Sequence, residues 1–294
     1  MNYKLAVSAW LGSQKLTEHE KAQRLRALRP SLDALRNSYQ ANSVQVSYEG
    51  STAEAYLLGY VPPYIHQAQE VLRCALPAAD LSGRDELRVG LLFPGPGPEL
   101  IALVRELRRL KMTPRLRVTY FDAANLGWAV ARHGLLRCAD EIYPRYTSAQ
   151  TADIDLRSPL SHDTIRRFRE FDIVIAQNMA NEIADSQQAL NNLVNALTSL
   201  RTGALVVLSD QRGYAVAAKK LEEGLTRRLQ PHFDVTHDAM LSSQHPQLCE
   251  QFSAPNFPLL DRNFFSPDPN MKLRARINMN VVEWIGVKRS TRRA

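Results

Sequence analysis

Cysteine is scarce in this sequence of 294 residues, and the three cysteines, Cys74, Cys138 and Cys249, lie far apart. Their number and spacing exclude a disulfide framework and a zinc site of the CxxC type, so we expect buried free thiols. Long apolar runs are also missing, and none approaches the roughly 18 residues that a membrane helix needs. This excludes a transmembrane protein. The N-terminal apolar stretch is too short for a signal peptide, so the sequence predicts a cytoplasmic protein.

Motifs of metal-dependent and nucleophilic catalysis are absent too. The sequence has no HxxxH, HExxH or GxSxG motif, and its seven histidines are scattered. We therefore predict neither a metal site nor a covalent nucleophile. With 45% hydrophobic and 23% charged residues, the composition is that of a soluble globular chain. The length suits one large α/β domain with an appendage, or two modest domains.

Positive charge is concentrated near the C-terminus. The chain has 37 Lys and Arg against 30 Asp and Glu, a net charge of +7. From residue 272 onward, one acid, Glu283, stands among seven basic residues: Lys272, Arg274, Arg276, Lys288, Arg289, Arg292 and Arg293. This segment carries +6, and the first 271 residues, with 30 basic and 29 acidic side chains, carry +1. The basic cluster has two interpretations, a contact for RNA phosphates or a solvated tail that keeps the chain soluble.

Residues 1–80 differ in character from the rest and predict a helical region. Two capping boxes, which begin at Thr17 and Ser51, precede apolar residues at helical spacing. A pair of prolines at 62–63 must break or restart the second helical stretch. We therefore expect a helical N-terminal region over residues 1–80 and an α/β domain with a basic tail over residues 81–294.

Short apolar runs alternate with amphipathic helical patterns after residue 86. The runs are at 87–93, 116–121, 171–177 and 204–210, and the helical patterns are at 99–111, 125–137, 186–200 and 214–229. Runs that are apolar throughout are typical of strands buried on both faces, and the alternation implies a parallel sheet with helices on both sides.

Two further strands are predicted after Pro231, in the segment FDVTHDAML and at 276–288. No helical pattern lies between them, so they are expected to form an antiparallel hairpin at one edge. The predicted fold is therefore a doubly wound, mostly parallel α/β sheet with an antiparallel C-terminal edge hairpin, plus the helical N-terminal region.

A glycine turn, Gly95-Pro96-Gly97, lies between the first predicted strand and the helix after it. Glycines let a ligand approach the backbone closely, and the helix N-terminus offers unpaired N–H groups, so this is a turn for a nucleotide cofactor. The dinucleotide fingerprint needs a third glycine where Leu100 stands, and a P-loop needs a Gly-Lys-Ser/Thr tripeptide that does not follow here. Both of these sites are therefore disfavoured. The alternative is a proline-stiffened turn without a ligand.

An apolar strand followed by G-x-G resembles the first motif of the class I S-adenosylmethionine (SAM)-dependent methyltransferases, and the resemblance covers about residues 87–288. It implies SAM as the cofactor, with Gly95 and Gly97 beside it. Asp122, at the end of the second predicted strand, resembles the acid that binds the two ribose hydroxyls, and a helix cap is the alternative. Either Asp153 or Asp155 resembles the acid that contacts the adenine amino group, or each caps a helix.

Two positions depart from the family's pattern. Phe93 stands where many members have an acid near the methionine end of SAM, and Glu99 at the start of the helix is a substitute for it. The segment Gln177-Asn178-Met179-Ala180 lacks the Asp/Asn-Pro-Pro-aromatic motif of adenine-amino and glutamine methyltransferases. The sequence therefore gives little support to an adenine amino group or a glutamine side chain as the methyl acceptor.

Polar residues follow the fourth apolar run, where the family places the acceptor beside the methyl group. By this resemblance Gln177 would contact the cofactor, while Asn178 and Glu182 would orient the acceptor as catalytic residues. Helix capping is the alternative role. Tyr60 and Tyr64, from the helical region, are candidates to bind the substrate as a lid.

The predicted function is therefore SAM-dependent methyl transfer to a small molecule or to RNA. Phenylalanines in the segment 242–270 would either wall an apolar pocket for a small acceptor or form a packed cover; they are Phe252, Phe257, Phe264 and Phe265. The alternative is a catalytically inactive methyltransferase-like protein that binds a partner protein or RNA in assembly. The sequence leaves the oligomeric state open.

Overall fold

The fold is known from a computed structural model that describes residues 2–40, 47–211, 219, 221–238, 258–265 and 281–290. In this part of the chain, seven strands form one sheet in the order β3-β2-β1-β4-β5-β7-β6. The strands are β1 (Glu86–Leu92), β2 (Arg115–Phe121), β3 (Tyr146–Ala152), β4 (Ile173–Gln177), β5 (Leu205–Gln211), β6 (Phe233–Asp238) and β7 (Val281–Lys288). β1 to β5 are parallel, and β7 is antiparallel to both β5 and β6. This confirms the predicted mostly parallel sheet and its antiparallel hairpin at the C-terminal edge.

The central strands are apolar throughout because both faces of the sheet are covered. Ile173 and Ile175 of β4 belong to one hydrophobic core, whereas Val174 and Ala176 belong to the other. Since successive side chains of a strand point to opposite faces, a strand between two cores needs an apolar residue at every position.

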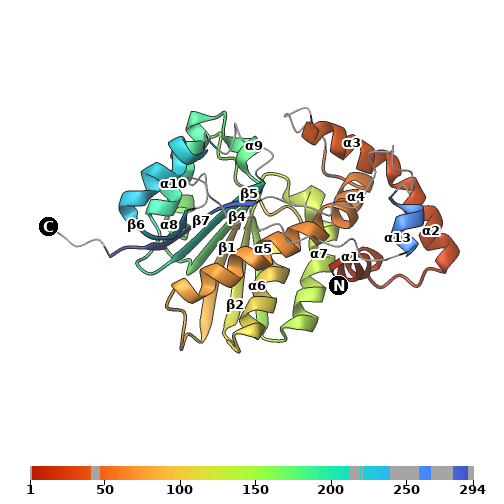
Figure 1. The fold of residues 1–294 in the computed structure, drawn as a ribbon, viewed down its shortest axis with the longest axis horizontal. Coiled ribbons are helices and arrows are strands. Elements are labelled where there is room, and N and C mark those ends of the chain that lie inside the picture. The colour runs from red at the N-terminus through yellow and green to blue at the C-terminus, as the bar shows by residue number, and fades with distance from the viewer. Residues whose placement is uncertain are drawn as a thin grey trace.

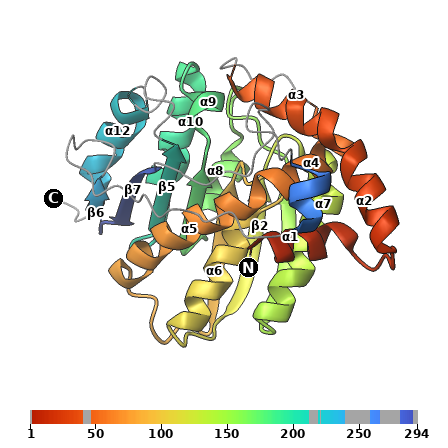
Figure 2. The ribbon, with the colours of Figure 1, turned by 45° about the vertical axis from the view of Figure 1, so that its right-hand side comes forward.

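Helices lie on both faces of the sheet (Figures 1 and 2). The first core contains residues of α5 (Val61–Ala75), α6 (Pro98–Arg109) and α7 (Asn125–Ile142). The second core contains residues of α8 (His162–Phe168), α10 (Gln187–Thr198), η3 (Glu222–Thr226) and α12 (Arg227–Leu229). Two short turns, η1 (Leu76–Ala78) and η4 (Gln230–His232), follow α5 and α12. Of the helix predicted at 214–229, the residues before 219 lie outside the described ones.

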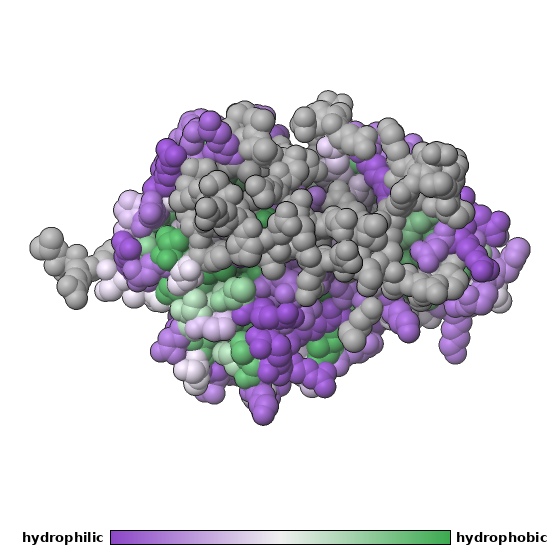
Figure 3. Space-filling view, in the orientation of Figure 1, coloured by the Kyte–Doolittle hydropathy of each residue, from purple (hydrophilic) through white to green (hydrophobic). Residues whose placement is uncertain are grey.

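The N-terminal helices extend the first core beyond the edge of the sheet. They are α1 (Asn2–Leu11), α2 (Glu18–Ala27), α3 (Arg29–Gln40) and α4 (Ser51–Gly59), with α13 (Pro258–Asn263) lying among them at the right of Figure 1. Trp10, Leu35 and Leu58 share one continuous core with Val89 of β1. In α2 only Leu25 is buried, and the hydrophilic side chains of these helices are visible at the right of Figure 3.

The helix boundaries confirm one capping prediction and correct another. Thr17 accepts a hydrogen bond from the backbone N–H of Glu20, whose side chain reaches back to Thr17, so the first capping box is present. The second box is wrong, because Gly50, at a φ of 51°, is the residue that precedes α4, and Ser51 is already inside the helix. Helix α4 ends at Gly59 and α5 begins at Val61 with its two prolines in the first turn, so the prolines restart the helix as predicted.

The edge strand β3 was missed by the sequence analysis. Its sequence, YTSAQTA, is polar, and Ser148, Ala149 and Gln150 are exposed. An edge strand with exposed side chains gives no apolar run. The strand predicted at 276–288 is β7, and residues 276–280 lie outside the described ones.

The two described cysteines differ in their surroundings. Cys138 is buried and Cys74 is exposed, so the prediction of buried thiols is wrong for Cys74, while Cys249 lies outside the described residues. Among the described helices, none combines the length and the apolar character that crossing a membrane requires.

Candidate functional site

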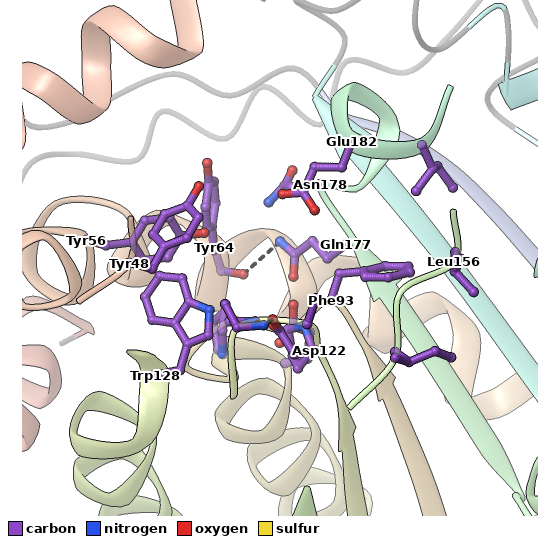
Figure 4. Close-up of a pocket in the computed structure, with 18 of the residues that line it drawn as sticks. Tyr48, Tyr56, Tyr64, Phe93, Asp122, Trp128, Leu156, Gln177, Asn178 and Glu182 are labelled. Carbon is purple, nitrogen blue, oxygen red and sulfur yellow. Dashed lines mark hydrogen bonds between the residues drawn. The ribbon is translucent and has the colours of Figure 1, made fainter. Parts of the chain in front are cut away.

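A cavity of about 560 Å³ lies at the carboxyl ends of β1, β2 and β4 (Figure 4). The order of the strands reverses between β1 and β4, and open α/β sheets bind ligands at this point. The N-terminal helices and the loop after β3 complete the wall. This volume is within the range of small-molecule sites.

The glycine turn contributes to the cavity through Gly95 but not through Gly97. Gly95 has a φ of 53° and lines the cavity. Gly97 has a φ of 93°, and a Cβ there would lie 2.5 Å from a ring carbon of Tyr120. The structure therefore explains Gly97 by the close packing of the turn on β2, and does not place it among the lining residues.

Asp122 is anchored to this turn. Its Oδ2 accepts a hydrogen bond from the N–H of Gly95 at 3.0 Å, and its Oδ1 accepts one from the N–H of Ala124 at 2.8 Å. The carboxylate is 8% exposed and lines the cavity. Burial raises the pKa of Asp122, and the two backbone hydrogen bonds oppose this rise. The residue is thus a rigid acceptor at the cavity wall.

Two buried polar residues that the sequence analysis missed hold the loops after β1 and β2 together. Arg132 of α7 donates to the carbonyl of Gly95 at 2.6 Å and to Oδ1 of Asn125 at 2.7 Å. Asn125 donates to the carbonyl of Asp122 and to Oδ1 of Asp153, both at 2.8 Å. No local sequence pattern identifies them, because Arg132 reaches Gly95 across 37 residues and Asn125 reaches Asp153 across 28 residues.

The structure separates Asp153 from Asp155. Asp153 is exposed and does not line the cavity. Asp155 lines it, although its carboxylate accepts hydrogen bonds from the N–H of Arg157 at 2.9 Å and from the hydroxyl of Ser158 at 3.0 Å. Its apolar neighbour Ile154 also lines the cavity.

Two buried acceptor atoms at the cavity have no hydrogen-bond partner among the described residues. One is Oε2 of Glu99, a residue of the first turn of α6 that is 3% exposed. The other is Oε1 of Gln177, also 3% exposed, whose Nε2 donates to the carbonyl of Tyr64 at 3.1 Å. Burial raises the pKa of Glu99 to about 8. Since buried polar atoms are nearly always paired, these two atoms point to a ligand with hydrogen-bond donors.

Asn178 and Glu182 follow β4 on the opposite side of the cavity from Tyr48 and Tyr56 (Figure 4). Asn178 has a φ of 57°, and its Oδ1 accepts a hydrogen bond from Gln67 of α5 at 3.3 Å. Glu182 lies in the short helix α9 (Ala180–Ile183), and its side chain is exposed where the cavity opens. Partial loss of hydration in this hollow raises the pKa of Glu182, and the charge of Asp122 acts in the same direction.

Aromatic rings form one side of the cavity, here called the tyrosine wall, which consists of Tyr39, Tyr48, Tyr56, Tyr64 and Trp128. The ring centroids of Tyr48 and Trp128 lie 4.5 Å apart, those of Tyr56 and Trp128 lie 4.9 Å apart, and the hydroxyls of Tyr39 and Tyr48 are 2.8 Å apart. Burial raises the pKa values of Tyr39, Tyr48 and Tyr56 above that of an ordinary tyrosine, so these phenols are neutral.

Tyr60 is not part of the wall's inner surface. Its ring stacks on Tyr56 at 5.2 Å between centroids, and it is 2% exposed. It therefore supports the wall from behind, while Tyr64 lines the cavity, and its role as a substrate contact stays a prediction. Tyr39, Tyr48, Tyr56 and Trp128 were not among the residues predicted for the site. The spacing of four residues between Tyr56, Tyr60 and Tyr64 was the one available signal.

The described part of the basic C-terminal segment consists of Lys288 and Arg289. Lys288 lies 5.1 Å from the ring centre of Phe233, and Arg289 pairs with Asp234 at 2.6 Å. The other five cations that the sequence suggested for RNA contact lie outside the described residues.

Two of the four phenylalanines predicted to wall a pocket or to form a cover are described. Phe264 and Phe265 are buried at α13, against the N-terminal helices, and do not line the cavity. Phe252 and Phe257 lie outside the described residues. Among the described residues, no group of three or more His, Cys, Asp or Glu side chains is arranged to hold a metal ion.

Comparison with known proteins gives matches only among solved structures. No family model and no curated protein matches the chain. The citrinin polyketide synthase CMeT domain is 15% identical with a TM-score of 0.46, covering 90% of this chain and 66% of its own. The plantazolicin methyltransferase BpumL in complex with SAH is 13% identical with a TM-score of 0.44, covering 92% and 99%. The glycopeptide N-methyltransferase MtfA complexed with SAM is 13% identical with a TM-score of 0.43, covering 75% and 93%.

At these identities and TM-scores, the matches say nothing about the acceptor or the catalytic residues of this chain. The seven-stranded sheet with its antiparallel β7 is consistent with the class I, Rossmann-like methyltransferase fold.

Proposed function

We propose that this chain is a SAM-dependent methyltransferase whose cofactor lies in the cavity beside Asp122. The observation that supports this most strongly is the convergence of hydrogen-bond acceptors on one cavity next to the glycine turn. Asp122, Glu99 and Gln177 all line it, and Oε2 of Glu99 and Oε1 of Gln177 lack partners among the described residues. SAM offers the matching donors, because it carries an amino group, two ribose hydroxyls and an adenine amino group.

The charge of the cavity favours SAM over cofactors that contain phosphate. The described lining residues include five acids, Glu99, Asp122, Asp155, Glu182 and Asp185, and one basic residue, Arg157. Burial raises the pKa of Glu99 to about 8, so near neutral pH the negative charge comes from the other acids. A pyrophosphate would be repelled by these carboxylates, whereas the sulfonium of SAM is a cation. Neutral tyrosine rings add to this preference because the face of an aromatic ring attracts cations.

The residues have distinct roles in this proposal. Asp122 would accept hydrogen bonds from the ribose hydroxyls, Glu99 and Gln177 would bind amino groups, and Asn178 and Glu182 would orient the acceptor. When bound, SAM supplies an electrophilic methyl group: a new bond forms to the methyl carbon while the electrons of its bond to sulfur stay on sulfur, which leaves S-adenosylhomocysteine (SAH). The protein then needs only to position the acceptor and remove its proton.

Calorimetric titration with SAM and SAH tests this proposal. Asp122→Asn should weaken binding about 10- to 100-fold, because hydrogen bonds to a charged acceptor contribute about 1.5–3 kcal/mol. Asp163→Asn is the matched control, since Asp163 is an exposed acid of α8 that does not line the cavity, and it should bind as the wild type does. Circular dichroism verifies the fold of each variant. If the folded wild type binds neither compound, the proposal is wrong and the alternative of an inactive, partner-binding protein is favoured.

A further inference from the structure

We infer that the methyl acceptor is a small amine, cationic in solution and carried on an apolar or aromatic body, that binds between the tyrosine wall and Glu182. This inference rests on the proposed function and specifies its acceptor. It follows from three features of the described residues: the aromatic surface, the sign of the charge around it, and the position of one carboxylate.

The tyrosine wall offers an extended aromatic surface at the cavity. Tyr48 and Tyr56 both contact Trp128, and Tyr60 fixes Tyr56 from behind. Rings braced in this way lose little entropy when a ligand packs on them, and their negative faces attract a cation within about 6 Å. A ligand with an ammonium group on an apolar body can use both effects, because its body packs on the rings and its charge is attracted to their faces.

The charge at the open side of the cavity disfavours an anionic acceptor. Asp155, Glu182 and Asp185 are exposed there, and Arg157 is the one cation among the lining residues that the structure describes. A carboxylate substrate or an RNA strand, which carries a phosphate at every nucleotide, would have to approach these acids. A cationic acceptor would instead be attracted toward the site.

Glu182 faces the wall across the cavity. Figure 4 shows it beside Asn178, opposite Tyr48, Tyr56 and Tyr64, and its charge acts on the hydroxyls of Tyr48 and Tyr56. An ammonium held between them would transfer one proton to the Glu182 carboxylate, which frees the nitrogen lone pair to form the N–C bond to the methyl group. Because Glu182 is exposed, it can then release that proton to solvent.

Three probes that share one ring test the inference by calorimetry on the chain saturated with SAH. They are phenethylamine, a cation; 2-phenylethanol, its neutral counterpart; and phenylacetate, an anion. We expect phenethylamine to bind at least about 5-fold more tightly than 2-phenylethanol, given about 1 kcal/mol for a cation on an aromatic face or near a carboxylate. Phenylacetate should show no saturable binding.

Variants assign this preference to the two sides of the cavity. Glu182→Gln should weaken phenethylamine about 2- to 5-fold and leave 2-phenylethanol unchanged. Tyr48→Leu should weaken phenethylamine about 3- to 30-fold, whereas Tyr48→Phe, which keeps the ring, should stay close to the wild type. Glu223→Gln, an exposed change away from the cavity, is the matched control for the loss of a negative charge. If Tyr48→Leu does not fold, Glu182→Gln still tests the charge.

The possible results separate this inference from the proposed function. Binding of SAH together with a preference for phenylacetate, or transfer of labelled methyl groups to total RNA and not to amines, overturns the inference and leaves the proposed function intact. Equal weakening of phenethylamine and 2-phenylethanol by Glu182→Gln also overturns it. Absence of SAH binding by the folded wild type overturns both.

Discussion

Replacing Glu99 by glutamine should change how the stability of the chain depends on pH. The side chain is 3% exposed, and burial raises its pKa from 4.5 to about 8. Between these values the folded chain holds a proton that the unfolded chain has released. The free energy of unfolding of the wild type therefore falls as pH rises through this window, and it is least affected below pH 4.5, where both states are protonated.

The size of the effect follows from this window. Each pH unit between the two pKa values lowers the free energy of unfolding by about 1.4 kcal/mol. From about pH 5 to about pH 7.5, ionisation of Glu99 should thus lower the free energy of unfolding of the wild type by about 3 kcal/mol. This contribution is missing from Glu99→Gln. Urea unfolding of the cofactor-free chain at a series of pH values measures this change in the free energy of unfolding. The difference between variant and wild type at each pH cancels the other ionisable groups.

The new amide also has a pH-independent effect, because it replaces a carboxyl by a group with two N–H donors, so only the slope of the difference reports the carboxyl. Glu223→Gln, at an exposed position, should reproduce the wild-type pH profile. A difference between Glu99→Gln and wild type that stays constant within about 0.5 kcal/mol over this range would refute the conclusion that burial raises the pKa of Glu99.

Two further predictions concern the tyrosine wall and the far end of the sheet. In a spectrophotometric titration, Tyr39, Tyr48 and Tyr56 should stay protonated well above pH 10 while exposed tyrosines ionise, and ionisation of all ten together near that pH would contradict the burial of the wall. Asp172 is 2% exposed, pairs with Arg84 and Arg201 and accepts from the N–H of Arg88 at 2.8 Å. Asp172→Asn should therefore lower the free energy of unfolding by about 2 kcal/mol, while the exposed Asp234→Asn should change it by less than about 0.5 kcal/mol; equal losses would contradict this assignment.

The part of the site that the sequence predicted depends on strand ends. Apolar runs located the ends of β1, β2 and β4, and in a parallel sheet these carboxyl ends meet at one edge. Gly95 and Asp122 follow two of these ends and Gln177 is the last residue of β4, and the structure brings all three to one cavity. The choice between Asp153 and Asp155 could not be made in this way, because β3 is a polar edge strand whose end the pattern did not mark.

The tyrosine wall depends on contacts between residues far apart in the sequence. Tyr39 comes from α3 and Tyr48 from the segment before α4, and both reach the cavity because of how the N-terminal helices pack on α7.

One glycine of α7 determines how closely this packing can occur. A Cβ at Gly127 would overlap the backbone carbonyl of Tyr48, and the next residue, Trp128, stacks on the ring of Tyr48. Gly134, about two turns further along the same face of the helix, allows the same close approach to the backbone of Ala9. A glycine inside a helix usually weakens it, so two of them in α7 indicate that another backbone must pass nearby. The sequence carries that indication without naming the partner, and only the packed structure shows that the first of these approaches positions Tyr48 in the tyrosine wall.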